Sequence, residues 1–262
     1  MVKKMTMVLF ALVLLLSCAT SPMGRRQFVL LDDSQMDEMG VQAFDNIKQE
    51  TPIEHDPQLN QYVNCITQAI VQVYQHAATP WEIVVFRDKT ANAFALPGGK
   101  VGVYTGMLEI ADNQDRLATV IGHEIAHVLS KHGNERVSQQ FAVEQGLALV
   151  QAIAQPTTQQ GQTLMGLLGV GATVGVLLPY SRIQESEADK MGLNLMANAG
   201  FNPQESVALW QKMSQQGEEV PEFLSTHPAH ATRIKELQNA MSQAMQLYQQ
   251  AQAGNKRPYC SL

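Results

Sequence analysis

Basic residues are scarce in this chain of 262 residues. The sequence has 18 lysines and arginines against 24 aspartates and glutamates, which gives a formal net charge of −6. It also lacks a basic stripe, zinc-knuckle spacing and an aromatic motif of the RNA-binding kind. A nucleic-acid-binding protein needs clustered positive charge. Nucleic acid is therefore excluded as an expected partner.

Charged residues are few in total, at 16% of the chain, whereas apolar residues make up 45%. This balance is typical of a globular protein and excludes a disordered one. The length allows one domain with a full hydrophobic core and short appendages. No internal repeat is visible.

A long hydrophobic run is missing at the amino terminus. The apolar stretch 7–16 follows the positively charged start 1–4 and is too short to span a bilayer permanently. Residues 1–17 are therefore expected to be a signal peptide. The sequence Leu-Leu-Ser-Cys that ends at Cys18 resembles a bacterial lipobox, so we expect lipid on Cys18; an ordinary signal peptide with an incidental cysteine is the alternative.

A lipidated Cys18 would anchor residues 18–36 as a tether. Ala19 follows the cysteine, where an aspartate often retains lipoproteins in the inner membrane. The expected location is therefore the periplasm, with a lipid anchor in the outer membrane. Such a compartment is oxidising, so Cys65 and Cys260 are expected to form a disulfide between an early helix and the carboxy terminus. Free buried thiols are the alternative.

Hydrophobic periodicity predicts a mostly helical α+β domain over residues 37–235, followed by an amphipathic helix and tail over 236–262. Expected strands cover 81–86, 93–96 and 101–104, and expected helices cover 37–75 in two parts, 115–131, 135–154, 181–199, 203–215 and 228–252. The apolar, glycine-rich segment 164–178 is too short to span a membrane. We expect a buried helix or a cover for the site there; a segment that dips into the membrane is the alternative.

The strongest chemical signal is the HExxH sequence at His123, Glu124 and His127. On a helix, residues four apart share a face, so both imidazoles can reach one metal ion. Zinc favours such nitrogen ligands, and a catalytic zinc site keeps one position open for water. Glu124 is then the expected base for that water. We expect one Zn²⁺ per chain.

A third ligand is expected from the acidic segment that contains Glu185, Glu187 and Asp189. Glu185 and Asp189 are four residues apart and share a helix face, whereas Glu187 points away. We assign Glu185 to the metal. Asp189 is expected to accept a hydrogen bond from the other nitrogen of a ligand histidine. A solvated acidic patch is the alternative.

These residues resemble one family of zinc metallopeptidases, the gluzincins that include HtpX, Oma1, the CAAX prenyl proteases, BepA and LoiP. The resemblance rests on HEIAH, on SRIQESEADKMG at 181–192, on NAFALPGG at 92–99 and on THP at 226–228. It runs from about residue 37 to residue 233. It implies a gluzincin fold with a small sheet beside the HExxH helix, and it implies Glu185 as the third ligand.

The resemblance also implies that the strand with Asn92, Ala93, Phe94 and Ala95 borders the cleft and pairs with an extended substrate. Main-chain pairing to an exposed sheet edge tolerates many sequences. A core strand followed by a turn is the alternative. The chain has no sequence like the tetratricopeptide repeats of BepA, so docking through such repeats is not expected.

His227, which precedes a proline, resembles a histidine that caps the open metal position in BepA-type enzymes. Spacing leaves open whether His227 blocks the metal or, with Arg233, contacts the oxyanion of the transition state. A surface histidine is a further alternative.

The expected function is hydrolysis of unfolded or misassembled envelope proteins by a zinc endopeptidase. A non-hydrolytic, chaperone-like lipoprotein on a zinc-bound scaffold is the alternative from another class.

Overall fold

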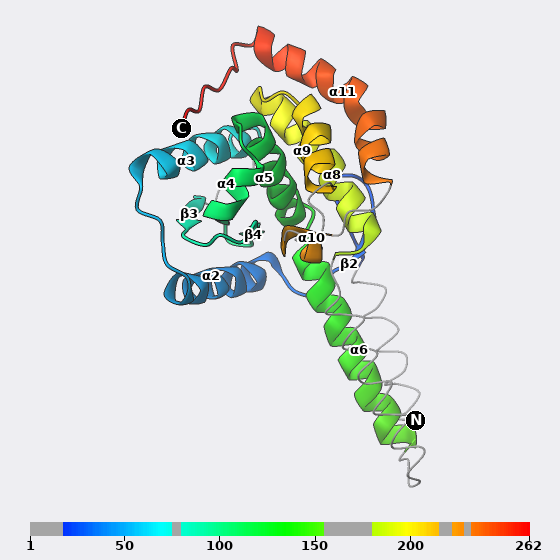
Figure 1. The fold of residues 1–262 in the computed structure, drawn as a ribbon. Coiled ribbons are helices and arrows are strands. Elements are labelled where there is room, and N and C mark those ends of the chain that lie inside the picture. Colours follow the sequence, from blue (N-terminus) through cyan, green and yellow to red (C-terminus); the bar gives the residue numbers. More distant parts are fainter. Residues whose placement is uncertain (1–17, 75–79, 155–179, 215–221, 228–231) are drawn as a thin grey trace. The chain divides into compact units, whose positions relative to one another are not determined.

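The computed structural model describes residues 18–74, 80–154, 180–214, 222–227 and 232–262 (Figure 1). Their strands are β1 (Cys18–Thr20), β2 (Arg26–Phe28), β3 (Glu82–Phe86), β4 (Ala93–Leu96) and β5 (Lys100–Tyr104). Their helices are α2 (Asp33–Glu50), α3 (Pro57–Val71), α4 (Thr105–Ile110), α5 (Gln114–Leu129), α6 (His132–Ala154), α8 (Arg182–Ala199), α9 (Gln204–Ser214), α10 (Glu222–Thr226) and α11 (Arg233–Ala253). These described residues divide into two compact units, one within 1–32 and 131–178 and the other within 33–130 and 179–262.

The first unit contains a short hairpin and one long helix. Strands β1 and β2 pair antiparallel. Arg25 makes a bidentate ion pair with Glu135 of α6, at 2.8 and 2.7 Å, and the Leu30 N–H donates to Ser138 Oγ at 2.8 Å. Part of the segment 18–36, which is expected to be a lipid-anchored tether, is thus bonded to α6, and α2 of the second unit begins within it at Asp33.

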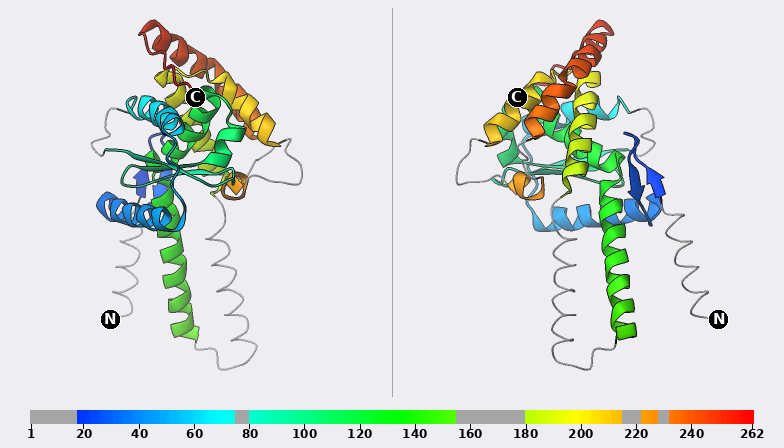
Figure 2. Two further views of the ribbon diagram at one scale, coloured as in Figure 1. Left: turned by 60° about the vertical axis from the view of Figure 1, so that its left-hand side comes forward. Right: turned by 90° about the vertical axis from the view of Figure 1, so that its right-hand side faces the viewer.

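The second unit contains a three-stranded sheet. β5 is central, parallel to β3 and antiparallel to β4, so β4 is an edge strand. Helix α2 covers one face of the sheet, and α3 and α5 cover the other (Figure 2). Successive side chains of a strand point to opposite faces of the sheet, and Phe86 and Phe94 both face Phe44 of α2. Gly102 leaves room on that face, since a Cβ there would overlap the Phe94 ring.

Helices α5 and α8 lie side by side and carry the two chemical motifs. Asn113 caps α5 by accepting from the N–H groups of its first turn, and Ser181 and Gln184 form a capping box on α8. The helices approach closely where Gly122 meets Gly192. A Cβ built on Gly122 would lie 3.0 Å from the Gly192 carbonyl oxygen. Two glycines at this crossing bring the ligand-bearing faces together.

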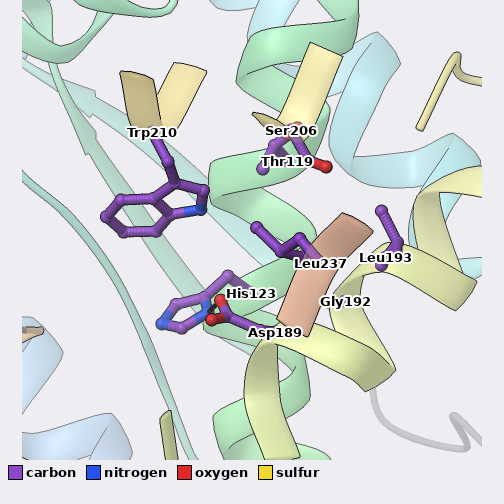
Figure 3. A pocket seen from close by; sticks show the side chains of 8 residues that line it. All are labelled: Thr119, His123, Asp189, Gly192, Leu193, Ser206, Trp210 and Leu237. Carbon is purple, nitrogen blue, oxygen red and sulfur yellow. Dashed lines mark ion pairs between the residues drawn. The ribbon is translucent and has the colours of Figure 1, made fainter. Parts of the chain in front are cut away.

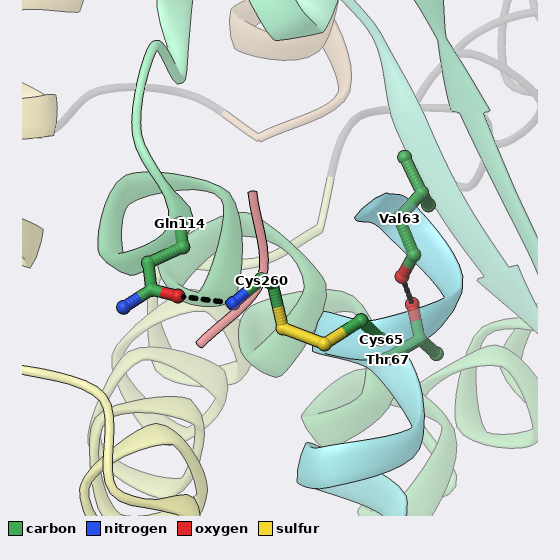
Figure 4. The surroundings of a disulfide bond; sticks show 5 residues. All are labelled: Val63, Cys65, Thr67, Gln114 and Cys260. Atoms are coloured by element: carbon green, nitrogen blue, oxygen red, sulfur yellow. Dashed lines mark hydrogen bonds between the residues drawn. A yellow bond between two sulfur atoms is a disulfide. The ribbon is translucent and has the colours of Figure 1, made fainter. Parts of the chain in front are cut away.

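A disulfide joins Cys65 of α3 to Cys260 in the C-terminal tail, with Cα atoms 5.8 Å apart (Figure 4). The Cys260 N–H also donates to Gln114 Oε1 at 2.9 Å. These bonds fasten the tail that follows α11 to the middle of α3 and to the start of α5, which are far apart in sequence.

The structure confirms the mostly helical α+β class. Short helices α4 and α10 were not predicted, and the expected boundary after residue 235 falls inside α11, which begins at Arg233. Residues 1–17 and 164–178 lie outside the described residues. Among those that are described, no helix has both the length and the hydropathy that crossing a membrane requires.

Candidate metal centre

Helix α5 presents His123, Glu124 and His127 toward α8. The two histidines are one turn apart, and their Nε2 atoms are 3.0 Å from each other. Both imidazoles are 2% exposed, and Glu124 is 3% exposed. Nitrogen lone pairs that converge in this way inside a protein are typical of metal ligands.

Helix α8 adds the two carboxylates expected from the sequence. Glu185 Oε1 lies 3.2 Å from His127 Nε2, and Glu185 Oε2 lies 3.5 Å from His123 Nε2. Asp189, one turn further along α8, lies on the other side of the His123 ring, with Oδ1 3.0 Å from Nδ1. A proton on Nδ1 donated to Asp189 leaves Nε2 free to bind a metal.

His227 brings a fourth donor atom to the same place. It follows α10 directly and is 3% exposed. Its Nδ1 lies 3.1 Å from His123 Nε2 and 3.0 Å from Glu185 Oε1, and its Nε2 lies 3.4 Å from Glu124 Oε1. His227 is therefore buried in the site.

These donors fit a tetrahedral ion. The ligand atoms of His123, His127, Glu185 and His227 all lie within 4.8 Å of one another. For metal–nitrogen distances of about 2.0–2.1 Å, a tetrahedral site has donor separations of roughly 3.3 Å. The five contacts described for these residues run from 3.0 to 3.5 Å, measured to one or the other oxygen of Glu185. Glu185 Oε2 is buried and has no hydrogen-bond partner among the described residues, as expected of a ligand atom.

Glu124 has the environment of a base. Burial raises its pKa to about 7, opposed by the charge of His227. Its carboxylate accepts a hydrogen bond from the Ala95 N–H of β4, while Oε1 has no hydrogen-bond partner among the described residues. A carboxylate whose pKa lies near neutrality can both take up and return a proton.

Two of the expected ligands, His127 and Glu185, have protonation states suited to metal binding. Burial lowers the pKa of His127, which keeps its imidazole neutral. Burial alone raises the pKa of Glu185, but the neighbouring histidines outweigh it and the net direction is down. Burial raises the pKa of Asp189, and Arg233 opposes that shift. Metal ligands must be neutral imidazoles and ionised carboxylates.

Arg233 opens α11 and reaches this cluster. Its Nη2 donates to Asp189 Oδ1 at 2.6 Å, and its Nη1 lies 2.9 Å from Glu185 Oε2 without the angle of a hydrogen bond. The guanidinium is 3% exposed and thus offsets buried carboxylate charge. It contacts the two carboxylates on the α8 face.

The free edge of β4 runs beside Glu124. Asn92 and Phe94 turn their main chains toward β5, since Tyr104 N–H donates to the Asn92 carbonyl at 3.0 Å. Ala93 and Ala95 then point their N–H groups outward. The first donates to the Asn92 Oδ1 at 2.9 Å and the second to Glu124. The edge expected for substrate is thus within hydrogen-bond reach of the expected base.

Three aromatic residues in the site were not anticipated. The His227 ring is stacked with Phe223 at 4.6 Å and with Tyr180 at 5.2 Å, with interplanar angles of 23° and 28°. Trp210 of α9 lies 6.2 Å from the His123 ring. Position offered a signal for two of them: Tyr180 immediately precedes the capping residue of α8, and Phe223 comes one helical turn before His227.

The chain is similar in sequence to known metallopeptidases. A family model described as Peptidase family M48 matches residues 57–241. The mitochondrial metalloendopeptidase OMA1 of Schizosaccharomyces pombe is 37% identical over 187 residues, which cover 70% of this chain and 53% of that protein. A beta-barrel assembly-enhancing protease of Yersinia pestis is 30% identical over 73% of this chain and 41% of its own length. The chain spans about half the length of the curated relatives it matches, or less.

Proposed function

The chain belongs to peptidase family M48, and on that premise we propose that it is a zinc-dependent endopeptidase. The observation that carries the proposal is the convergence of three imidazoles and one carboxylate beside a buried glutamate. His123, His127 and Glu185 are the ligands that would hold the ion. Two histidines and one carboxylate are a ligand set that zinc favours in peptidases.

The chain's own residues supply the proton transfers. When bound, zinc provides Lewis acidity, which acidifies water and polarises the scissile carbonyl. Glu124 takes the proton from the attacking water and gives it to the leaving amine, so that it ends each cycle in its starting state. Its contact with the Ala95 N–H holds the carboxylate next to the substrate edge. Asp189 holds the His123 ring in its ligating orientation.

We infer that substrates bind as an added strand on β4. Ala93 and Ala95 point main-chain N–H groups away from the sheet, toward the side of Glu124. Recognition by main-chain hydrogen bonds selects extended polypeptide and little side-chain identity. Unfolded or misassembled envelope proteins have this property. Lipid on Cys18, a periplasmic location and an outer-membrane anchor are parts of the proposal that rest on the lipobox sequence.

We further propose that the described conformation is latent. Nδ1 of His227 lies at the fourth corner of the ligand set, where water must bind for hydrolysis. The same segment reaches the substrate edge, because the Phe223 N–H donates to the Ala91 carbonyl at 3.1 Å, two residues before Ala93. Movement of this segment would open the metal corner and free the edge together.

Glu124→Gln tests the proposed activity. The purified full-length chain, Glu124→Gln and the control Glu109→Gln would be compared for zinc content and for cleavage of casein. We expect one zinc per chain in all three and loss of cleavage by about two orders of magnitude or more in Glu124→Gln alone. Cleavage near wild type in Glu124→Gln would refute the role of the base. Zinc without cleavage in both the wild type and His227→Ala, in which the proposed block is removed, would favour the chaperone-like alternative.

A further inference from the structure

The guanidinium of Arg233 is held through one face as well as through its edge. Its Cζ lies 3.4 Å from the ring centroid of Trp210, which is a stacked cation–π contact. Around its edge, Nη2 is bonded to Asp189, but Nε and Nη1 have no hydrogen-bond partner among the described residues. Nη1 is held by charge, 2.9 Å from Glu185 Oε2 without the angle of a hydrogen bond. These contacts restrain the edge of the guanidinium, and the indole ring restrains its face.

Trp210 itself is fixed in place. It is 3% exposed and lies 5.9 Å from the ring of Phe223. Together with His123 and Asp189 it lines a cavity of about 10 Å³ behind the metal centre (Figure 3). A cavity of that size holds roughly one water at most. The indole therefore has no space to turn away from the guanidinium.

We infer that Trp210 is a positioning residue for the metal centre, acting through Arg233. The stacked guanidinium places one nitrogen against Asp189, which orients His123, and another beside Glu185. The indole thus fixes the cation that sets two carboxylates, one a ligand and one the partner of a ligand. Groups that orient metal ligands change metal affinity by about 10- to 100-fold when they are lost. This inference rests on the proposed metal site.

The test compares zinc affinity in variants of the full-length chain, measured by competition with a chelator. Trp210→Met removes the π face and keeps an apolar side chain, Trp210→Phe keeps a π face, and Phe201→Met is a matched control for a fully buried aromatic. We expect roughly tenfold weaker zinc binding in Trp210→Met, since that is the lower end of the effect of orienting groups. We expect less than about a threefold change in Trp210→Phe and in the control.

Zinc affinity within about threefold of wild type in Trp210→Met would overturn the inference, as would an equal loss in Phe201→Met. A second measurement places the effect on Arg233. In an Arg233→Lys background, substitution of Trp210 should have little further effect, because residues that act as a unit are not additive. If Trp210→Met does not fold, the same cycle with Trp210→Leu, which also lacks a π face, decides, and additive effects overturn the inference. A chain that binds zinc but cleaves nothing, both as wild type and as His227→Ala, would refute the peptidase proposal alone.

Discussion

Nδ1 of His227 lies 3.1 Å from Nε2 of His123, at the position where the attacking water would bind in the proposed mechanism. The contact spans 104 residues of sequence and joins the segment after α10 to the HExxH helix. Phe223 and Tyr180 stack on the His227 ring, so the imidazole is held there by aromatic packing as well as by polar contacts. A histidine in this position leaves a metal ion no open corner.

Removal of His227 should therefore activate the enzyme. In His227→Ala the fourth corner is open to water, and three ligands still hold the ion. We expect cleavage of casein to rise about tenfold or more, because a competent state that must first expel the histidine is typically populated at ~10% or less. Initial rates at matched zinc occupancy measure this. The control is His55→Ala, which replaces an exposed histidine.

A fall in rate would reverse this interpretation. If His227→Ala cleaves more slowly than wild type while zinc content is unchanged, the histidine contributes to transition-state stabilisation. Equal cleavage rates in His227→Ala and in wild type would show that His227 neither blocks nor assists the reaction.

The sequence predicted the centre of this site well because its parts are local. HExxH and the pair Glu185 and Asp189 are each spaced by one helical turn, so helix geometry alone puts each pair on one face. Their convergence needs α5 to lie beside α8, which amphipathic patterns do not specify. The glycines at 122 and 192 were visible in the sequence, but their pairing is a property of the packed helices.

The aromatic residues could not be predicted in the same way. Trp210 lies on α9 and contacts Arg233 of α11 across a stretch of chain with no periodic pattern that relates them. Helix α10 is too short for hydrophobic periodicity to reveal, although it carries Phe223. Likewise the hairpin of β1 and β2 is made of three-residue strands, so its segment looked like a polar tether.

Gly192→Ala should disturb the site through the helix crossing. A Cβ on Gly192 would lie 2.8 Å from the His123 backbone nitrogen and 2.9 Å from the Gly122 carbonyl carbon. Backbone atoms cannot move aside as a side chain can, so α8 must shift away from α5. We expect a loss of stability of about 1–3 kcal/mol and weaker zinc binding, since each helix carries ligands. Urea unfolding of the apo chain and chelator competition measure the two effects.

Gly254→Ala is the matched control for that change. Its Cβ would meet only ordinary contacts, at 3.4 Å and beyond, in the last turn after α11. Equal stability and zinc affinity in wild type and Gly192→Ala would contradict the close approach of the two helices.

The disulfide should stabilise the fold strongly because it closes a long loop. Cys65 and Cys260 are separated by 195 residues. Loss of a crosslink that spans so many residues typically costs about 2–5 kcal/mol, in large part by releasing the unfolded chain. We expect the Cys65→Ser, Cys260→Ser double variant to have a free energy of unfolding lower by that amount, and therefore a lower urea midpoint. Dithiothreitol should bring wild type to the same midpoint and leave the double variant unchanged.

If wild type keeps its midpoint in dithiothreitol after full reduction is verified by thiol labelling, the crosslink contributes no stability.

If the substrate pairs with β4, the contribution of its main-chain N–H groups to binding should alternate from one residue of the peptide to the next. On an antiparallel edge, every second residue of an added strand exchanges main-chain hydrogen bonds with the sheet, here with Ala93 and Ala95. A series of peptides, each N-methylated at one position, tests this without changing the protein. Methylation at the inward-facing positions should raise KM up to about tenfold, because each lost hydrogen bond is worth ~0.5–1.5 kcal/mol. Methylation at the positions between them should leave KM nearly unchanged. A smooth dependence on distance from the cleaved bond, with no alternation, would instead indicate that side-chain pockets hold the substrate and that β4 is only a core strand.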